Sequence, residues 1–136
     1  MNDSNTMTAF NRLEVAALQS IAAVYPASEF QLARLFEACA AIKRTNTVRG
    51  FLTELILQRR AFAPIKFRSP LGEAWISVKG LRFGICCLVF LTEGYPTLLE
   101  GYAVGAEDTS TIDFDSVAFG VRSAPPTSED NIELDI

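Results

Sequence analysis

Residues 85–102, ICCLVFLTEGYPTLLEGY, constrain the fold more than any other stretch of the chain. Two apolar runs flank a Glu-Gly pair, which is typical of a β-hairpin closed by a two-residue turn. If Glu93 and Gly94 form that turn, counting back along both strands places Cys87 opposite Glu100. Both faces of the first strand are apolar, so we expect a central strand covered on at least one side. Gly101 indicates a bulge or a close approach of another backbone.

The carboxylate of Glu100 stands among apolar neighbours, and three interpretations are open. It can occupy a half-exposed position on an open face of the sheet. It can be a buried structural acid, which needs a cation or backbone N–H groups because an unpaired buried charge is costly. It can also act as a catalytic acid or base, although one carboxylate without a histidine or a metal-ligand cluster is a weak catalytic signal.

The remaining periodicities define the fold class. Apolar residues recur every three or four positions over residues 9–24 and 29–43, which predicts two amphipathic helices. Short β-branched and aromatic segments follow, at residues 50–57, 72–79 and 117–121, on either side of the hairpin in sequence. The sequence therefore predicts an α+β fold, with two N-terminal helices packed on one face of a four- to five-stranded antiparallel sheet.

At 136 residues the chain has the length of one domain, and we expect that domain to span residues 1–122. Residues 123–136 are polar, acidic and proline-bearing, which predicts a disordered tail. The first ten residues do not resemble a secretory leader, and no apolar run approaches the ~18 residues of a membrane span. We therefore expect a cytoplasmic protein with no membrane segment.

Histidine is absent, and the three cysteines are Cys39, Cys86 and Cys87. This composition excludes Ser-His-Asp and Cys-His nucleophile systems, histidine metal ligands and a four-cysteine zinc site. Neighbouring strand residues point to opposite faces, so we interpret Cys86 and Cys87 as buried apolar fillers rather than as a disulfide, a metal pair or a reactive thiol. We expect a protein that is not an enzyme, with no catalytic residue, cofactor or metal.

Charge is unevenly distributed along the chain, although its formal net value is only −4. Residues 43–82 contain nine basic and two acidic residues, whereas residues 93–136 contain ten acidic residues and one basic residue. The two halves can neutralise each other within the fold, or they can form a two-signed surface that selects a partner by electrostatic steering. The low isoelectric point and the acidic tail argue against nucleic acid as the partner.

Two segments, RTNTVRGFLTEL and LVFLTEGYPTLLEGY, resemble motifs of a family of small uncharacterised bacterial proteins. The first motif reads R-x-x-T-x-x-G-F-x-T and the second F-x-x-x-G-x-x-x-x-L-E-G-Y. The likeness covers residues 40–105, and it departs from the family at Val48 and Arg49, where small residues are usual. It also lacks the tryptophan-proline segment that often follows the hairpin. Some similar proteins are immunity-like, which implies a protein-binding role.

These observations favour a non-enzymatic protein-binding module with an immunity-like or regulatory role and an unidentified protein partner. The alternative is a small-molecule-binding or minor enzymatic domain that uses Glu100 in a pocket between helices and sheet. An exposed edge strand would also allow a homodimer. The candidate binding residues are Arg49, Trp75, Tyr95, Glu100 and Tyr102.

Overall fold

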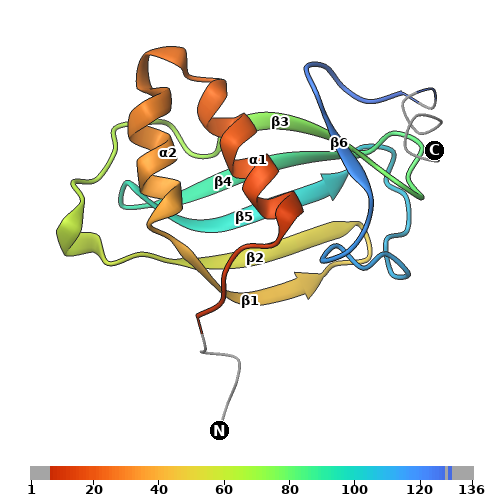
Figure 1. Ribbon diagram of the computed structural model, residues 1–136, viewed down its shortest axis with the longest axis horizontal. Helices are drawn as coiled ribbons and strands as arrows, with labels where there is room; N and C mark the ends of the chain where they lie inside the picture. The colour runs from red at the N-terminus through yellow and green to blue at the C-terminus, as the bar shows by residue number, and fades with distance from the viewer. Residues whose placement is uncertain (1–6, 128, 130–136) are drawn as a thin grey trace, which may run out of the picture.

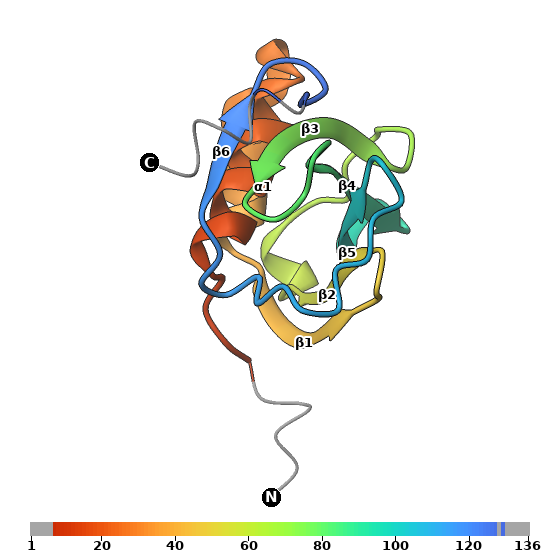
Figure 2. The same cartoon turned by 90° about the vertical axis from the view of Figure 1, so that its right-hand side faces the viewer.

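The computed structural model describes residues 7–127 and 129, and it confirms the α+β class. Two helices accompany one antiparallel sheet of six strands, in the order β1-β2-β5-β4-β3-β6, which is slightly more than the four or five strands predicted. The sheet is curved, and both helices lie on its concave side (Figures 1 and 2). The elements are α1 (Arg12–Ala23), α2 (Glu29–Glu37), β1 (Ala40–Asn46), β2 (Gly50–Ile56), β3 (Leu71–Val78), β4 (Ile85–Thr92), β5 (Tyr95–Ala103) and β6 (Phe119–Arg122), with short 3-10 turns at Pro26–Ser28 and Arg59–Ala61.

Helix α1 confirms the first predicted helix and supplies much of the core. Asn11 caps it: the Asn11 side chain accepts from the N–H of Glu14, and the Glu14 carboxylate accepts from the N–H of Asn11. This reciprocal capping box satisfies two backbone donors that a helix start otherwise leaves unpaired. Ala17 and Ile21 follow on the buried face, and both are fully buried. The apolar stripe thus packs α1 against the concave side of the sheet.

The second predicted helix is wrong at its C-terminal end. Helix α2 stops at Glu37, and the chain from Ala40 runs as edge strand β1 instead of continuing the helix to residue 43. Strand β1 pairs with β2 on both sides of an irregularity at Ile42, and Ala41 also bridges to Thr8. The apolar residues 39 and 42 have helical spacing, but this pattern is weak. Pairing with β2 and with Thr8 overrides it, because tertiary contacts can outweigh a local preference.

The hairpin turn is confirmed, but the predicted register beyond it is wrong by one residue. Glu93 and Gly94 both have positive φ, at 54° and 83°, and Thr92 pairs with Tyr95. The register then shifts: Leu91 pairs with Pro96 and Phe90 with Leu98, which leaves Thr97 as the extra residue of a β-bulge. Because side chains alternate along a strand, one inserted residue moves every later side chain of β5 to the other face.

Cys87 therefore faces Gly101 rather than Glu100, and Leu88 is the cross-strand neighbour of Glu100. Leu99 and Ala103 point into the core, where Leu99 is fully buried. At Gly101 the predicted bulge or close backbone approach is replaced by a side-chain contact, since a Cβ there would overlap the ring of Phe51. Glu100 and Tyr102 consequently lie on the side of the sheet that faces away from the helices.

Strand β3 has the predicted alternation, because Ala74, Ile76 and Val78 are all buried in the core. Pro126 is also buried, beside Gly84, so the part of the predicted tail just after residue 122 packs on the domain. The prediction of disorder for residue 128 and residues 130–136 lies outside the described residues. Neither helix in the described part of the chain is long and apolar enough to cross a membrane.

Candidate functional site

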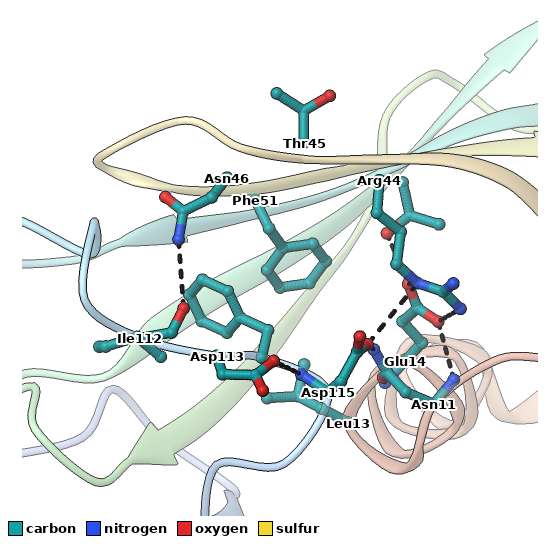
Figure 3. Close-up of a pocket in the computed structure, with 12 residues that line it drawn as sticks. Asn11, Leu13, Glu14, Arg44, Thr45, Asn46, Phe51, Ile112, Asp113 and Asp115 are labelled. Atoms are coloured by element: carbon teal, nitrogen blue, oxygen red, sulfur yellow. Dashed lines mark hydrogen bonds and ion pairs between the residues drawn. The ribbon is translucent and has the colours of Figure 1, made fainter. Parts of the chain in front are cut away.

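A buried acid is present in this fold, but it is Glu14 rather than Glu100. The Glu14 side chain is 1% exposed and joins α1 to β1 and β2 (Figure 3). Its Oε1 accepts from the Asn11 N–H at 2.9 Å and from Nη2 of Arg44 at 2.7 Å. Its Oε2 accepts from Nε of Arg44 at 2.9 Å and from the Thr53 hydroxyl at 2.6 Å. The hydrogen bond to Glu14 also raises the pKa of Arg44.

Four accepted hydrogen bonds fill the lone pairs of the Glu14 carboxylate. No acceptor capacity remains for a substrate proton, so this network is built to hold α1 on the sheet. The spacing Asn11-x-x-Glu14 is visible in the sequence as a capping pattern. What the sequence does not show is that Arg44 and Thr53, on two other elements, meet the same carboxylate.

A cavity of about 150 Å³ lies next to this network, between β1, β2 and the segment before β6. Its wall includes the rings of Phe51 and Phe114 and the carboxylates of Asp113 and Asp115 (Figure 3). Asn46 closes one side by donating to the carbonyls of Thr109 and Ile112. Ligand pockets usually measure roughly 300–1,000 Å³, so this cavity is small for a metabolite. No buried side-chain N or O atom among the described residues lacks a hydrogen-bond partner.

The convex side of the sheet, here called the outer face, carries partly exposed apolar side chains from β2, β3, β4 and β5. Two rows of cross-strand neighbours organise it: one runs Tyr102, Cys86, Trp75, and the other runs Leu52, Glu100, Leu88. The members of the outer face are Leu52, Ile56, Trp75, Leu88, Phe90, Leu98 and Tyr102, with the acids Glu54, Glu73 and Glu100. Neither α1 nor α2 covers this side of the sheet (Figure 2).

Glu100 sits in the middle of the outer face and is half-buried between Leu52 and Leu88. Within residues 7–127 and 129, no cation and no N–H group contacts its carboxylate at ion-pair or hydrogen-bond distance. Of the three interpretations open from the sequence, this setting corresponds to the first, a half-exposed position on an open face of the sheet. The helix–sheet pocket of the alternative function does not contain Glu100, because the bulge at Thr97 turns this side chain to the opposite side.

The cysteines lie in settings that keep their thiols protonated. Burial raises the pKa of Cys86 to about 11 and that of Cys39 to about 12, and it raises the pKa of the fully buried Cys87 as well. A hydrogen bond with Cys86 raises the pKa of Tyr102 to about 12. A thiol with a raised pKa is a poor nucleophile at neutral pH because little thiolate is present.

At one end of the outer face, adjoining segments of the chain carry four exposed apolar side chains, here called the loop-end cluster: Val48, Phe83, Tyr102 and Val104. Their exposed fractions are 45%, 40%, 36% and 38%. Backbone hydrogen bonds bring the three contributing loops together: Ala103 N–H donates to the Arg49 carbonyl at 2.7 Å, and Val104 N–H donates to the Gly84 carbonyl at 3.0 Å.

The tip of this cluster is conformationally strained. Val48 has a φ of 71°, which is unfavourable for a β-branched residue. It is held there because its N–H donates to Oδ1 of Asn46 at 2.9 Å and its carbonyl accepts from the Thr109 N–H at 2.8 Å. Residues in such conformations persist where the surroundings over-determine them, and they gather at functional sites.

The structure brings four of the five predicted binding residues to one region. Glu100, Tyr102 and Trp75 share the outer face, and Arg49 lies beside Tyr102 because the next residue, Gly50, pairs with it. Tyr95 is at the other end of the hairpin, where its hydroxyl donates to the Phe62 carbonyl at 3.0 Å. Sequence reasoning missed Val48, Phe83 and Val104, which become neighbours only through the loop contacts.

Comparison with protein-family models, with curated proteins and with solved structures finds no match to this chain. The resemblance to small bacterial proteins therefore stays a prediction. No group of three or more potential metal ligands occurs within the described residues.

Proposed function

We propose that this chain is a non-enzymatic protein-binding module that binds its partner through the loop-end cluster and the adjoining outer face. The observation that carries the proposal is the gathering of four exposed, large apolar side chains at one end of an uncovered sheet face. Contiguous exposed apolar surface marks interaction sites more often than scattered single residues do. Trp75, Tyr102 and Arg49 are also of the residue types that dominate binding energy at protein interfaces.

The finer role follows from the resemblance and from the charge pattern. The proposed module is bacterial and cytoplasmic, with an immunity-like or regulatory role, and its partner is another protein. A homodimer is an additional form of the proposal, since β1 and β6 are the edge strands of the sheet. The backbone hydrogen bonds at Arg49, Val48 and Gly84 hold the loops of the loop-end cluster in place before a partner binds. This preorganisation lowers the entropy cost of binding, which supports the proposal.

Site-specific photo-cross-linking in the cell that makes the protein tests this proposal. A photoreactive phenylalanine analogue replaces Tyr102 in one variant and Phe30 in a matched control, because Phe30 is 76% exposed on α2, away from the outer face. We expect one cross-linked protein product of defined mass from position 102 and none from position 30. Loss of that same complex in native mass spectra of Trp75→Ala and Val104→Ser variants would extend the assignment to the whole surface.

Equal cross-linking from both positions would contradict the proposal, and so would a native mass spectrum that shows a bound metabolite in place of a protein. The latter result would favour the small-molecule-binding function. The observation in favour of that second candidate is the cavity beside Arg44, which is lined by the rings of Phe51 and Phe114 and by Asp113 and Asp115. Its small volume and the occupied hydrogen bonds of Glu14 make it the weaker candidate.

A further inference from the structure

The connection between β2 and β3 spans residues 57–70 and is the most strongly basic segment of the structure. It contains four basic residues and no acidic one, so it contributes +4 to a chain whose net charge is −4. The rest of the protein therefore carries −8. Apart from the short 3-10 turn at Arg59–Ala61, it has no helix or strand of its own, and such long irregular connections are uncommon in compact domains and are often functional.

One buried side chain and three hydrogen bonds hold the basic connection in place. The side chain of Ile65 is buried in the core, and its N–H donates to the Gly94 carbonyl at 2.9 Å. The Phe62 carbonyl accepts from the Tyr95 hydroxyl, and Oγ of Ser69 accepts from the N–H of Leu91 at 2.9 Å. The connection is thus a fixed platform against the β4–β5 hairpin, and its side chains project from a defined backbone.

Its cations are largely unneutralised. Arg59 stacks on the Tyr95 ring at 4.7 Å and approaches Glu93 at 3.9 Å. Arg60, Lys66 and Arg68 are exposed, and none of them makes a hydrogen bond or ion pair with another described residue. The acids of the segment between β5 and β6 lie at the opposite end of the sheet from this connection (Figure 1). The fold therefore separates the two signs of charge here instead of neutralising them.

We propose that the connection 57–70 is a docking site for an acidic protein segment, with Arg60, Lys66 and Arg68 as the contacts. The occupant is inferred from charge complementarity, because a short run of Asp and Glu side chains matches three exposed cations carried on a backbone that is held in place. A nucleic acid is a less suitable partner. Its phosphate charges extend beyond the connection, so the net charge of −8 on the rest of the protein would repel them. The aromatic rings at this connection are not open for base stacking either: Phe62 and Phe67 pack against the core, and Arg59 covers Tyr95. This proposal rests on residues other than those of the proposed function, so each can fail alone.

Fluorescence anisotropy with a labelled octaglutamate peptide tests the proposal directly. The variant Arg60→Ala/Lys66→Ala/Arg68→Ala is compared with the control Arg12→Ala/Arg34→Ala/Lys43→Ala, which removes three exposed cations elsewhere. In 50 mM NaCl we expect about tenfold weaker binding by the first variant and less than about twofold weakening by the control, because local rather than net charge decides the contact. A labelled eight-residue oligothymidylate should bind more weakly than the peptide.

The proposal is overturned if both triple variants lose the same affinity, if the oligothymidylate binds at least as tightly as the peptide, or if the unaltered protein shows no saturable binding. Chemical-shift mapping of the unaltered protein gives a readout that does not depend on the folding of any variant. Octaglutamate should shift the amide signals of residues 57–70 and leave the loop-end cluster unchanged. Shifts centred elsewhere would reject this site.

Discussion

Replacing Glu14 with glutamine should destabilise the domain more than any other single carboxylate substitution. All four partners of this carboxylate are donors: the Asn11 N–H, two nitrogens of Arg44 and the Thr53 hydroxyl. A glutamine side chain presents an oxygen on one side only, so its NH₂ group must face two of these donors. The Thr53 hydroxyl can rotate and accept from that NH₂ group, but Nε of Arg44 then loses its acceptor.

The magnitude follows from what is lost. A hydrogen bond to a charged group contributes about 1.5–3 kcal/mol, and removing one partner of a buried ion pair costs roughly 3–5 kcal/mol. The Arg44 side chain is 31% exposed and can regain water, which lowers the cost. We expect a loss of about 2–3 kcal/mol in the free energy of unfolding. With a urea m-value of roughly 2 kcal/mol per molar, the urea midpoint should fall by about 1 M.

Urea unfolding followed by circular dichroism, at neutral pH and fixed salt, measures this shift. Glu93→Gln is the matched control, because Glu93 is 82% exposed and its ion pair with Arg59 is long. Such surface pairs contribute less than about 1 kcal/mol, so the control midpoint should stay near that of the unaltered protein. If the Glu14→Gln midpoint lies as close to the unaltered protein as the control does, the buried network does not hold α1 on the sheet.

Three further outcomes are expected. Val48→Gly should raise the free energy of unfolding by about 0.5–1 kcal/mol and so raise the urea midpoint. Glycine tolerates positive φ, and little packing is lost because Val48 is 45% exposed. An unchanged or lower midpoint would show that Val48 is not strained. The free energy of unfolding should be flat in pH up to about 8 and should then fall towards pH 11. The reason is that the unfolded chain releases the Cys86 proton near the ordinary thiol pKa, while the folded chain keeps it; urea midpoints at pH 7.5 and 10 should therefore differ less in Cys86→Ala, and an equal difference would count against this linkage. A chain ending at Thr127 loses four acids, which takes the net charge from −4 to 0, and it should elute from a cation exchanger at higher salt than the full chain, with an unchanged urea midpoint. Ending at Thr127 keeps the buried Pro126, so a large loss of stability would show that the removed residues pack as structure.

The hairpin shows how far sequence reasoning reaches. A two-residue turn at Glu93 and Gly94 is predictable because turn chemistry is local: both residues must adopt positive φ, and the flanking apolar runs end there. The bulge at Thr97 is not predictable, because no local signal distinguishes it from a regular strand residue. A single inserted residue was enough to turn Glu100 from its predicted neighbour, Cys87, to Leu88.

The sequence by itself determined the chemistry that is excluded, the α+β class, the apolar face of α1 and the turn of the hairpin. Each depends on composition or on a periodicity within one segment, which tertiary contacts do not change. Only the tertiary structure decided that Glu14 is the buried acid, that the loops carrying Val48, Phe83 and Val104 adjoin the end of β5, and that the basic connection stands apart from the acidic segment before β6. These outcomes depend on which strands pair and in which register, and pairing is set by contacts between residues far apart in the chain.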